Sequence, residues 1–154
     1  MKKVIKLNVI PEKSLILNGF GKVHYYDAYQ IEKQTELSAE EISKDIMKLP
    51  RWVILLLKLR NSIGGFFGLK KTDKKIGEDD FFTLIEKNEN EIVAGETDKH
   101  LDFRTSVMKN TAENTISLIT IVHFNNVWGR IYFFPVKPLH KIMIRTLLKK
   151  YLKG

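Results

Sequence analysis

The sequence predicts an α+β fold in which an antiparallel β-sheet curves around a long C-terminal helix. Three observations support this prediction. Helical patterns occupy the middle and the end of the chain, whereas period-two patterns cluster between them. The period-two segments follow one another across short polar turns, as in antiparallel hairpins. The last segment is amphipathic, so that it and the sheet can bury their apolar faces against each other.

The N-terminal part is expected to hold two strands and a helix. A short strand is predicted near Val4–Val9, and the aromatic and β-branched residues of Val23–Glu32 predict a longer one. Ser38 is followed three residues later by Glu41, which is the pattern of a helix capping box. A helix is therefore predicted over about Ala39–Leu49.

A second helix, RWVILLLKLRNSI, is expected directly behind Pro50, because proline cannot continue a preceding helix but suits the first turn of a new one. It ends in GGFFGLKKT, where Gly64, Gly65 and Gly68 weaken helix continuation. This segment predicts an apolar, bendable loop, and a linker over Lys70–Asp80 follows it.

Two hairpins follow the linker. FFTLIEKNENEIVAGETD is expected to turn near Asn88–Asn90, and KHLDFRTSVMKNTAENTISLITIVHF near Asn110–Asn114. NNVWGRIYFFPV is expected to form a last strand, which Pro135 and Pro138 stop. A helix is then predicted over Leu139–Leu152.

The closing helix is predicted to be amphipathic. Its packing side is apolar and holds Leu139, Ile142, Met143, Leu147 and Tyr151. Its basic residues recur at intervals of four: Lys137, Lys141, Arg145, Lys149 and Lys153. This basic ridge is interpreted as a solvated face whose charges complement the helix dipole. The functional alternative is peripheral docking to an anionic membrane or to an acidic partner.

Length and composition fit a single domain over residues 1–154. The chain has no cysteine, which excludes disulfides, thiolate metal sites and a cysteine nucleophile. The longest uncharged apolar run, Trp52–Leu57, is far shorter than the roughly 18 residues of a membrane-spanning helix. The first residues lack the apolar core and cleavage site of a signal peptide. We therefore expect a cytoplasmic protein.

The net charge of +8 is unevenly distributed. Basic residues gather over Lys48–Lys75 and Lys137–Lys153, whereas Glu78–Asp102 is acidic. Such a charge allows weak binding to phosphate-rich polymers or anionic lipids. Because the sequence contains no helix-turn-helix, zinc-finger or RNP signature, no specific nucleic-acid binding is expected.

The stretch DKHLDFRTSV places polar and apolar residues on alternate faces of an expected strand. The apolar face holds Leu101, Phe103, Thr105 and Val107, and the polar face holds His100, Asp102, Arg104 and Ser106. The polar face is interpreted as a solvated convex surface. The alternative is a polar recognition site built from His100, Asp102, Arg104 and His123. Two imidazoles and a carboxylate can bind zinc or iron, but no third histidine with defined spacing accompanies them, so a metal site is not predicted.

Four motifs, in this order over about Tyr25–Lys150, resemble a bacterial family, domain of unknown function family 2867: HYYDAYQIE, LPRWVILLLKLRNSIGGFFGLK, GETDKHLDFRTSV and HFNNVWGRIYFFPVKPLHKIMIRTLLKK. The resemblance implies a helix-grip fold, like that of START lipid-transfer domains, polyketide cyclases and the birch pollen allergen. It implies a hydrophobic cavity between the sheet and the C-terminal helix, and no catalytic residue. Some family members are fused to a dehydrogenase-like NAD-binding domain, but this chain contains no G-x-G-x-x-G motif.

The leading functional expectation is a protein that binds a small hydrophobic or amphipathic ligand in this cavity, without a cofactor. Pockets of this kind are mostly apolar with a few polar anchors. The residues expected to line it are Leu101, Phe103, Phe124, Tyr132, Phe134 and Met143, with Trp52 and Phe66 near the mouth. The glycines around Phe66 and Phe67 would let these two rings act as a gate, although an ordinary turn explains them equally well.

Two alternatives remain open. One is an enzyme of cyclase, isomerase or dehydratase type that uses a pocket carboxylate or histidine; Glu96, Asp98 and Asp102 are candidate general bases if they are buried. No hydrolase motif is present and no catalytic residue is predicted. The other is a non-catalytic accessory domain that packs on a dehydrogenase-like protein partner.

Overall fold

The computed structural model describes residues 3–46, 83–97 and 99–153. Their elements, in chain order, are β1 (Ile5–Lys6), the 3-10 helix η1 (Leu15–Leu17), β2 (Tyr25–Glu32), α1 (Ala39–Ile46), β3 (Thr83–Lys87), β4 (Glu91–Thr97), β5 (Leu101–Asn110), β6 (Thr115–Phe124) and α3 (Val127–Lys153). The second helix, the glycine-rich loop and the linker expected from the sequence lie outside the described residues. So do Trp52, Phe66 and Asp98.

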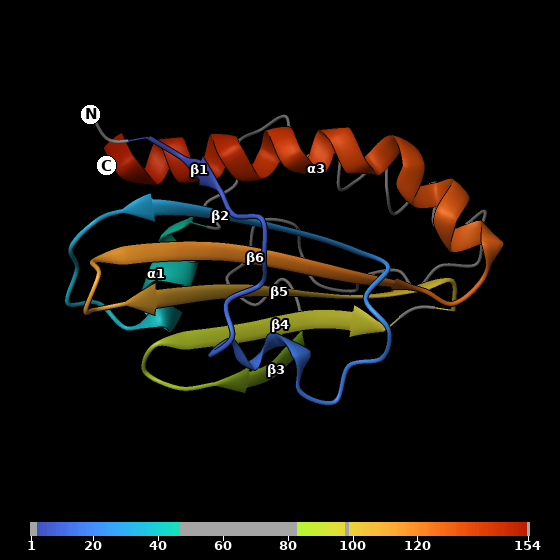
Figure 1. The fold of residues 1–154 in the computed structure, drawn as a ribbon, viewed down its shortest axis with the longest axis horizontal. Helices are drawn as coiled ribbons and strands as arrows, with labels where there is room; N and C mark the ends of the chain where they lie inside the picture. The colour runs from blue at the N-terminus through green and yellow to red at the C-terminus, as the bar shows by residue number, and fades with distance from the viewer. Residues whose placement is uncertain (1–2, 47–82, 98, 154) are drawn as a thin grey trace.

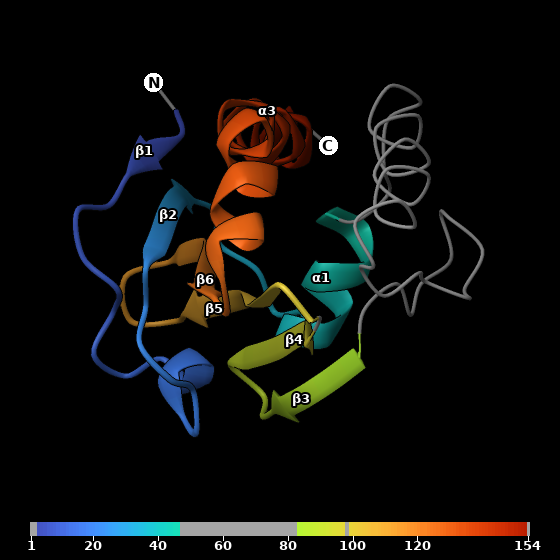
Figure 2. The ribbon, with the colours of Figure 1, turned by 90° about the vertical axis from the view of Figure 1, so that its right-hand side faces the viewer.

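The strands form one six-stranded sheet in the order β1-β2-β6-β5-β4-β3, and every neighbouring pair is antiparallel. Figure 2 shows this sheet curving around α3 and α1, while the N-terminal segment crosses its opposite face. In Figure 1 that segment runs in front of the strands and α3 extends along the edge of the sheet. The arrangement is the predicted α+β fold, consistent with a helix-grip-like architecture.

The two predicted hairpins are confirmed. β3 and β4 are joined through Asn88–Asn90, where the side-chain oxygen of Asn88 accepts hydrogen bonds from the amides of Asn90 and Glu91, each at 2.9 Å. β5 and β6 are joined by a turn in which Asn114 adopts φ 53°. Asparagine tolerates this left-handed conformation better than most residues.

The predicted capping box at the start of α1 is also confirmed. The Glu41 amide donates to Ser38 Oγ at 3.2 Å, and Glu41 Oε1 accepts from the Ser38 amide at 3.4 Å. The bonds satisfy amides that a helix start leaves without partners. Helix α1 then buries Ile42 and Ile46 against the inner face of the sheet.

The last expected strand is wrong: NNVWGRIYFFPV begins a helix. Asn126 Oδ1 accepts a hydrogen bond from the Gly129 amide at 3.1 Å, which is an N-cap interaction, and α3 starts at Val127. Pro135 and Pro138 lie inside this helix and do not end it. Figure 1 shows that α3 bends before it runs straight to its C-terminal end, as prolines within helices commonly cause.

The start of α3 lies close to the start of β5. The His100 carbonyl accepts a hydrogen bond from the Asn125 amide at 2.9 Å. A Cβ atom added to Gly129 would lie only 2.2 Å from the same carbonyl oxygen. A glycine is therefore required for the first turn of α3 to approach the sheet this closely.

Both faces of the sheet are covered. The concave face packs on the helices through a cluster that includes Tyr29, Val107, Leu118, Ile144 and Leu147. The convex face packs on the N-terminal segment through Ile16, Ala28, Val93, Ile119 and Ile121. The convex face is thus not the solvated surface that the sequence predicts, because the segment from Leu7 to Val23 packs on it. Among the described helices, none has the length and apolar character needed to cross a membrane.

Candidate functional site

A polar cluster lies on the concave face of the sheet, opposite α3. Strand alternation directs Tyr25, Asp27 and Tyr29 of β2 to this face. Asp27 pairs in register with Thr120 of β6. Helix α3 supplies His140 from the other side of the interface. Tyr25, Asp27, Thr120 and His140 are called the Asp27 cluster below.

One carboxylate oxygen holds the cluster together. The Tyr25 hydroxyl donates to Asp27 Oδ2 at 2.6 Å. His140 Nε2 lies 3.3 Å from the same oxygen and 3.2 Å from Thr120 Oγ1. With its proton on Nε2, His140 donates to Asp27, because an ionised carboxylate can only accept.

The second carboxylate oxygen is not used by these residues. Asp27 is only 1% exposed, and within the described part of the chain its Oδ1 atom has no hydrogen-bond partner. Leaving a buried acceptor without a partner costs about 1–3 kcal/mol, and more when the group is charged. Asp27 Oδ1 is therefore an acceptor positioned on the inner face and available to a donor from outside the cluster.

Burial and the hydrogen bond to Asp27 together raise the pKa of Tyr25 above its ordinary value of 10.0. Tyr25 is therefore a neutral hydroxyl that donates to Oδ2 throughout the physiological pH range. Lys137 Nζ lies 5.3 Å from the centre of the Tyr25 ring, so a cation from α3 also faces this aromatic side chain.

An aromatic and aliphatic wall continues from the cluster toward the start of α3. Its buried members are Leu101, Val122 and Phe133, packed with Tyr25, Phe103, Phe124, Tyr132 and Val136. The Phe133 ring centre lies 4.9 Å from that of Tyr25 and 5.7 Å from that of Phe124. Tyr25 therefore belongs to both the polar cluster and the apolar wall, which makes the two continuous.

The residues predicted to line the cavity have different positions. Leu101, Phe103, Phe124 and Tyr132 belong to the apolar wall. Met143 packs against the neighbouring core cluster between the sheet and the helices. Phe134 does not line the interface as predicted from the sequence. It is 82% exposed on the outer side of α3 and does not face the sheet, because the segment is helical.

His100 and Asp102 interact with the loop before α3. The buried His100 ring faces the Asn126 side chain, with Nδ1 2.8 Å from Nδ2 and 3.1 Å from Oδ1. Depending on the imidazole tautomer, His100 Nδ1 accepts from the amide nitrogen or donates to the amide oxygen. Asp102 Oδ1 accepts a hydrogen bond from Asn125 Nδ2 at 3.1 Å. These two residues thus help to position the N-terminus of the helix.

Arg104 and His123 interact with the N-terminal segment. Arg104 Nη1 donates to the carbonyl oxygens of Ile16, at 3.0 Å, and Asn18. His123 Nδ1 lies 2.6 Å from the Lys22 carbonyl oxygen. Asp102 and His123 are in-register partners on neighbouring strands β5 and β6. The hydrogen bonds described here connect His100 and Asp102 to the loop before α3, and Arg104 and His123 to the N-terminal segment. Among the described residues, no three His, Cys, Asp or Glu side chains are placed to hold a metal ion.

A second buried carboxylate lies on the convex face and provides a comparison. Glu91 is 2% exposed and accepts hydrogen bonds from Ser14 Oγ at 2.6 Å, the Leu15 amide at 2.8 Å and the Ser106 hydroxyl. Both of its oxygens have partners from the protein itself. Glu91 is therefore a structural anchor for the N-terminal segment, whereas Asp27 retains an unused oxygen.

Asp27 and His140 are not among the site residues predicted from the sequence. The available signal was in YYDAYQ, where alternation places an acid between two tyrosines on the face that must be buried. For His140 the signal is weaker. The sequence pattern predicts a strand before it, so the sequence does not show that His140 lies on the inner face of a helix that continues through both prolines.

The comparisons with known proteins identify a family of unknown function. The family described as Protein of unknown function (DUF2867) matches residues 20–147. No curated protein and no solved structure matches the chain. The matched range includes every residue of the Asp27 cluster and of the apolar wall.

Proposed function

We propose that this chain, which belongs to the DUF2867 family of proteins of unknown function, binds a small amphipathic molecule between the sheet and α3. The ligand's polar group faces Asp27, and its apolar body contacts the wall around Phe133. The observation that carries the proposal is the buried Asp27 carboxylate, whose Oδ1 atom has no partner among the described residues.

The chemistry of the cluster defines the polar group of the ligand. Asp27 Oδ2 already accepts from Tyr25 and faces His140, so only Oδ1 remains for a ligand. A carboxylate accepts hydrogen bonds, and a buried one favours a partner that donates or carries positive charge. The expected polar group is therefore a hydroxyl, an amide N–H or an amine.

The apolar wall defines the rest of the molecule. Leu101, Val122 and Phe133 form a buried apolar cluster beside the Asp27 cluster, and the aromatic rings of Phe124 and Tyr25 pack against it. Burial of a ligand against such a surface contributes roughly 25 cal/mol for each Å² of apolar area removed from water. A single donor on an aliphatic or aromatic body satisfies both parts of the site.

Native mass spectrometry of the protein purified from its own host tests the proposal. The wild type is expected to carry a non-covalent small molecule, and Asp27→Asn is expected to lose most of it, because the amide presents a donor where the ligand needs an acceptor. Glu91→Gln is the matched control: it alters a buried carboxylate on the other face and is expected to keep the ligand. Retention of the same molecule by Asp27→Asn would exclude Asp27 as the anchor.

The contact between Asp27 and His140 supports a second candidate, an enzyme of cyclase, isomerase or dehydratase type. A carboxylate that accepts a hydrogen bond from a histidine fixes the orientation and the tautomer of the imidazole, as general acid–base catalysis requires. In this case His140→Gln is expected to retain a bound molecule that differs from the wild-type one in mass or chromatographic retention, since substrate accumulates in place of product. The same molecule in both proteins indicates binding without turnover.

A further inference from the structure

The outer side of α3 is apolar over its first half. Of the twelve large hydrophobic residues that are exposed in the described part of the chain, six lie on this helix. They are Val127, Trp128, Ile131, Phe134, Leu139 and Ile142, with exposed fractions of 41% to 82%. Val127, Ile131 and Phe134 follow one another at intervals of four and three residues, so that they share one helix face. A shallow depression on this face is lined by Arg130, Ile131 and Phe134.

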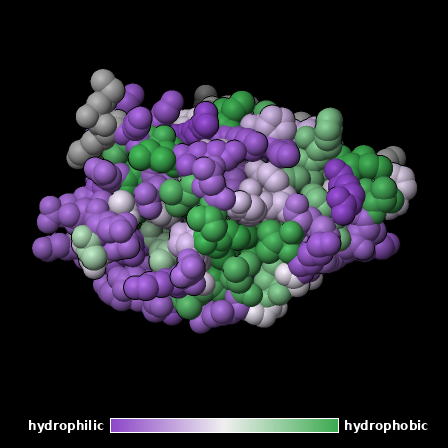
Figure 3. All heavy atoms as spheres, in the orientation of Figure 1, coloured by the Kyte–Doolittle hydropathy of each residue, from purple (hydrophilic) through white to green (hydrophobic). Residues whose placement is uncertain are grey.

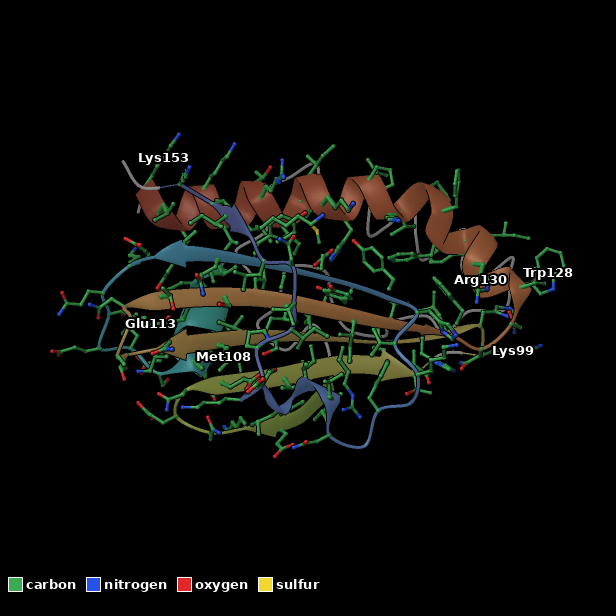
Figure 4. The ribbon with its side chains drawn as sticks, viewed as in Figure 1. Lys99, Met108, Glu113, Trp128, Arg130 and Lys153 are labelled. Atoms are coloured by element: carbon green, nitrogen blue, oxygen red, sulfur yellow. The ribbon has the colours of Figure 1, made fainter. Side chains whose placement is uncertain are left out.

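The figures show where this face lies. In Figure 4 the Trp128 side chain projects away from the strands at the N-terminal end of α3. In Figure 3 hydrophobic residues lie beside hydrophilic ones at the right-hand end of the molecule, where Figure 1 places the start of α3. The opposite side of the helix is already occupied, because Phe133, Ile144 and Leu147 are buried against the sheet. The exposed side chains thus form a surface separate from the Asp27 cluster.

The second half of the same helix is basic. Five of the seven lysines and arginines of α3 lie there, namely Lys141, Arg145, Lys149, Lys150 and Lys153, whereas Arg130 and Lys137 lie in the first half. The helix contains no aspartate or glutamate. Lys149 and Lys153 are exposed and lie one turn apart near the C-terminal end. The outer side of α3 therefore changes along its length from apolar and aromatic to positively charged.

From this arrangement we propose that the outer side of α3 docks onto an anionic lipid membrane surface. An occupant of this face must offer apolar contact at one end and negative charge at the other. A membrane interface with acidic headgroups offers both, since aromatic and aliphatic side chains enter the boundary of the acyl region while lysines remain among the headgroups. A second copy of the same face supplies apolar contact but adds like charge, and a nucleic acid uses the lysines but not the exposed Phe134.

The proposed orientation follows from the helix itself. The first turns, with Trp128, Ile131 and Phe134, enter the interface, and the C-terminal turns lie over the headgroups. Since the inner side of α3 stays packed on the sheet, docking requires no unfolding of the helix. The inference does not depend on the ligand site, because the two use opposite sides of α3.

Flotation with vesicles of phosphatidylcholine alone, and of phosphatidylcholine with about 30% phosphatidylserine, tests the proposal at low and moderate salt. Binding is expected only to the anionic vesicles and is expected to weaken as salt increases. The double variants Ile131→Gln/Phe134→Gln and Lys149→Gln/Lys153→Gln are each expected to bind about tenfold more weakly. Circular dichroism and urea denaturation confirm that each variant folds.

Two controls separate this surface from general properties of the protein. Lys13→Gln/Lys22→Gln removes two exposed lysines from the N-terminal segment and is expected to leave vesicle binding unchanged. Asp27→Asn is expected to bind vesicles as the wild type does, whatever its effect on the ligand. The proposal is overturned if the wild type does not bind anionic vesicles at either salt concentration. It is also overturned if Lys13→Gln/Lys22→Gln weakens vesicle binding as much as the two double variants of α3 do. If the wild type self-associates and Ile131→Gln/Phe134→Gln abolishes this, the face binds a second copy of the chain. If the protein binds nucleic acid tightly and the same variant leaves this binding unchanged, the lysines bind nucleic-acid phosphates. Either result overturns the lipid assignment.

Discussion

His140 Nε2 lies 3.3 Å from Asp27 Oδ2, and this contact connects the C-terminal helix to the second strand through polar groups inside an otherwise apolar interface. Asp27 is 1% exposed, and the His140 side chain is 15% exposed. Burying a carboxylate requires hydrogen bonds that replace those of water. Tyr25 and His140 provide this replacement for one oxygen only, which is why the other oxygen is the centre of the functional proposal.

The two buried carboxylates are expected to differ in their contribution to stability. Glu91→Gln is expected to lower the free energy of unfolding by about 1–3 kcal/mol, because three donors converge on this carboxylate and glutamine keeps a single acceptor oxygen. Asp27→Asn is expected to change it by less than about 1 kcal/mol, since removal of a buried charge offsets the weaker hydrogen bonds. Urea denaturation of the two variants measures both values. A larger loss for Asp27→Asn would mean that Asp27 is mainly a structural residue.

The start of α3 provides a second prediction. In Gly129→Ala the new Cβ atom meets the His100 carbonyl oxygen at 2.2 Å, so the helix must shift away from β5. This shift is expected to cost about 2 kcal/mol or more in the free energy of unfolding. Gly21→Ala is the control, because its Cβ atom meets only the His123 ring at 3.9 Å, and it is expected to stay within about 0.5 kcal/mol of the wild type. Equal stability of the two variants would contradict the close packing of α3 on β5.

The contrast between α1 and α3 shows what could be predicted from local sequence. The capping box at Ser38 and Glu41 identified the start of α1, because both residues act within one turn. At α3 the cap Asn126 and the prolines gave conflicting signals. The sequence pattern predicts that Pro135 and Pro138 end a strand, but a helix with exposed prolines on its outer side bends and continues. Tertiary packing of Phe133 on the sheet decided between the two, and this packing cannot be read from local pattern.

His24 is expected to make the protein less stable in mild acid. Its Nδ1 atom accepts a hydrogen bond from the Phe124 amide at 2.9 Å, which requires an unprotonated nitrogen. Desolvation, and then the nearby charges of His123, Arg130 and Lys22, lower the pKa of His24 below 6.5. The unfolded chain therefore takes up a proton as the pH falls through 6.5, while the folded chain resists it, so stability decreases in this window.

Urea denaturation of the wild type and His24→Gln at a series of pH values from about 7 to 5 measures this effect. As the pH falls, the free energy of unfolding of the variant is expected to decrease less than that of the wild type, because glutamine does not titrate. Identical pH dependence in the two proteins would show that His24 does not contribute to it.

Tyr25 gives a prediction at the opposite end of the pH scale. Burial, and then the hydrogen bond to Asp27, raise its pKa above 10.0. Above this pH the unfolded chain releases the phenolic proton while the folded chain keeps it, so the stability contributed by Tyr25 is complete below pH 10.0 and decreases as the pH rises beyond it. Tyr25→Phe is expected to show a smaller decrease than the wild type in denaturation experiments between about pH 9 and 11. A decrease of the same size in both proteins would mean that the Tyr25 hydroxyl is not held by Asp27.

The candidate site was less predictable than the fold. Strand alternation correctly separated Leu101, Phe103 and Val107, which face the helices, from Asp102 and Arg104, which face the other way. It could not show that the N-terminal segment covers this other face, because the contacts of Arg104 with Ile16 and Asn18 join residues far apart in sequence. For the same reason the approach of His140 to Asp27 becomes visible only in three dimensions.

A crystal structure of the protein purified from its own host is the most direct measurement of the central claim, that Asp27 anchors a ligand between the sheet and α3. We expect electron density for a non-protein molecule with a donor atom about 3 Å from Asp27 Oδ1 and an apolar part against Phe133. Density that shows Oδ1 bonded only to water or to another side chain of the protein, in an interface filled by protein alone, would contradict it.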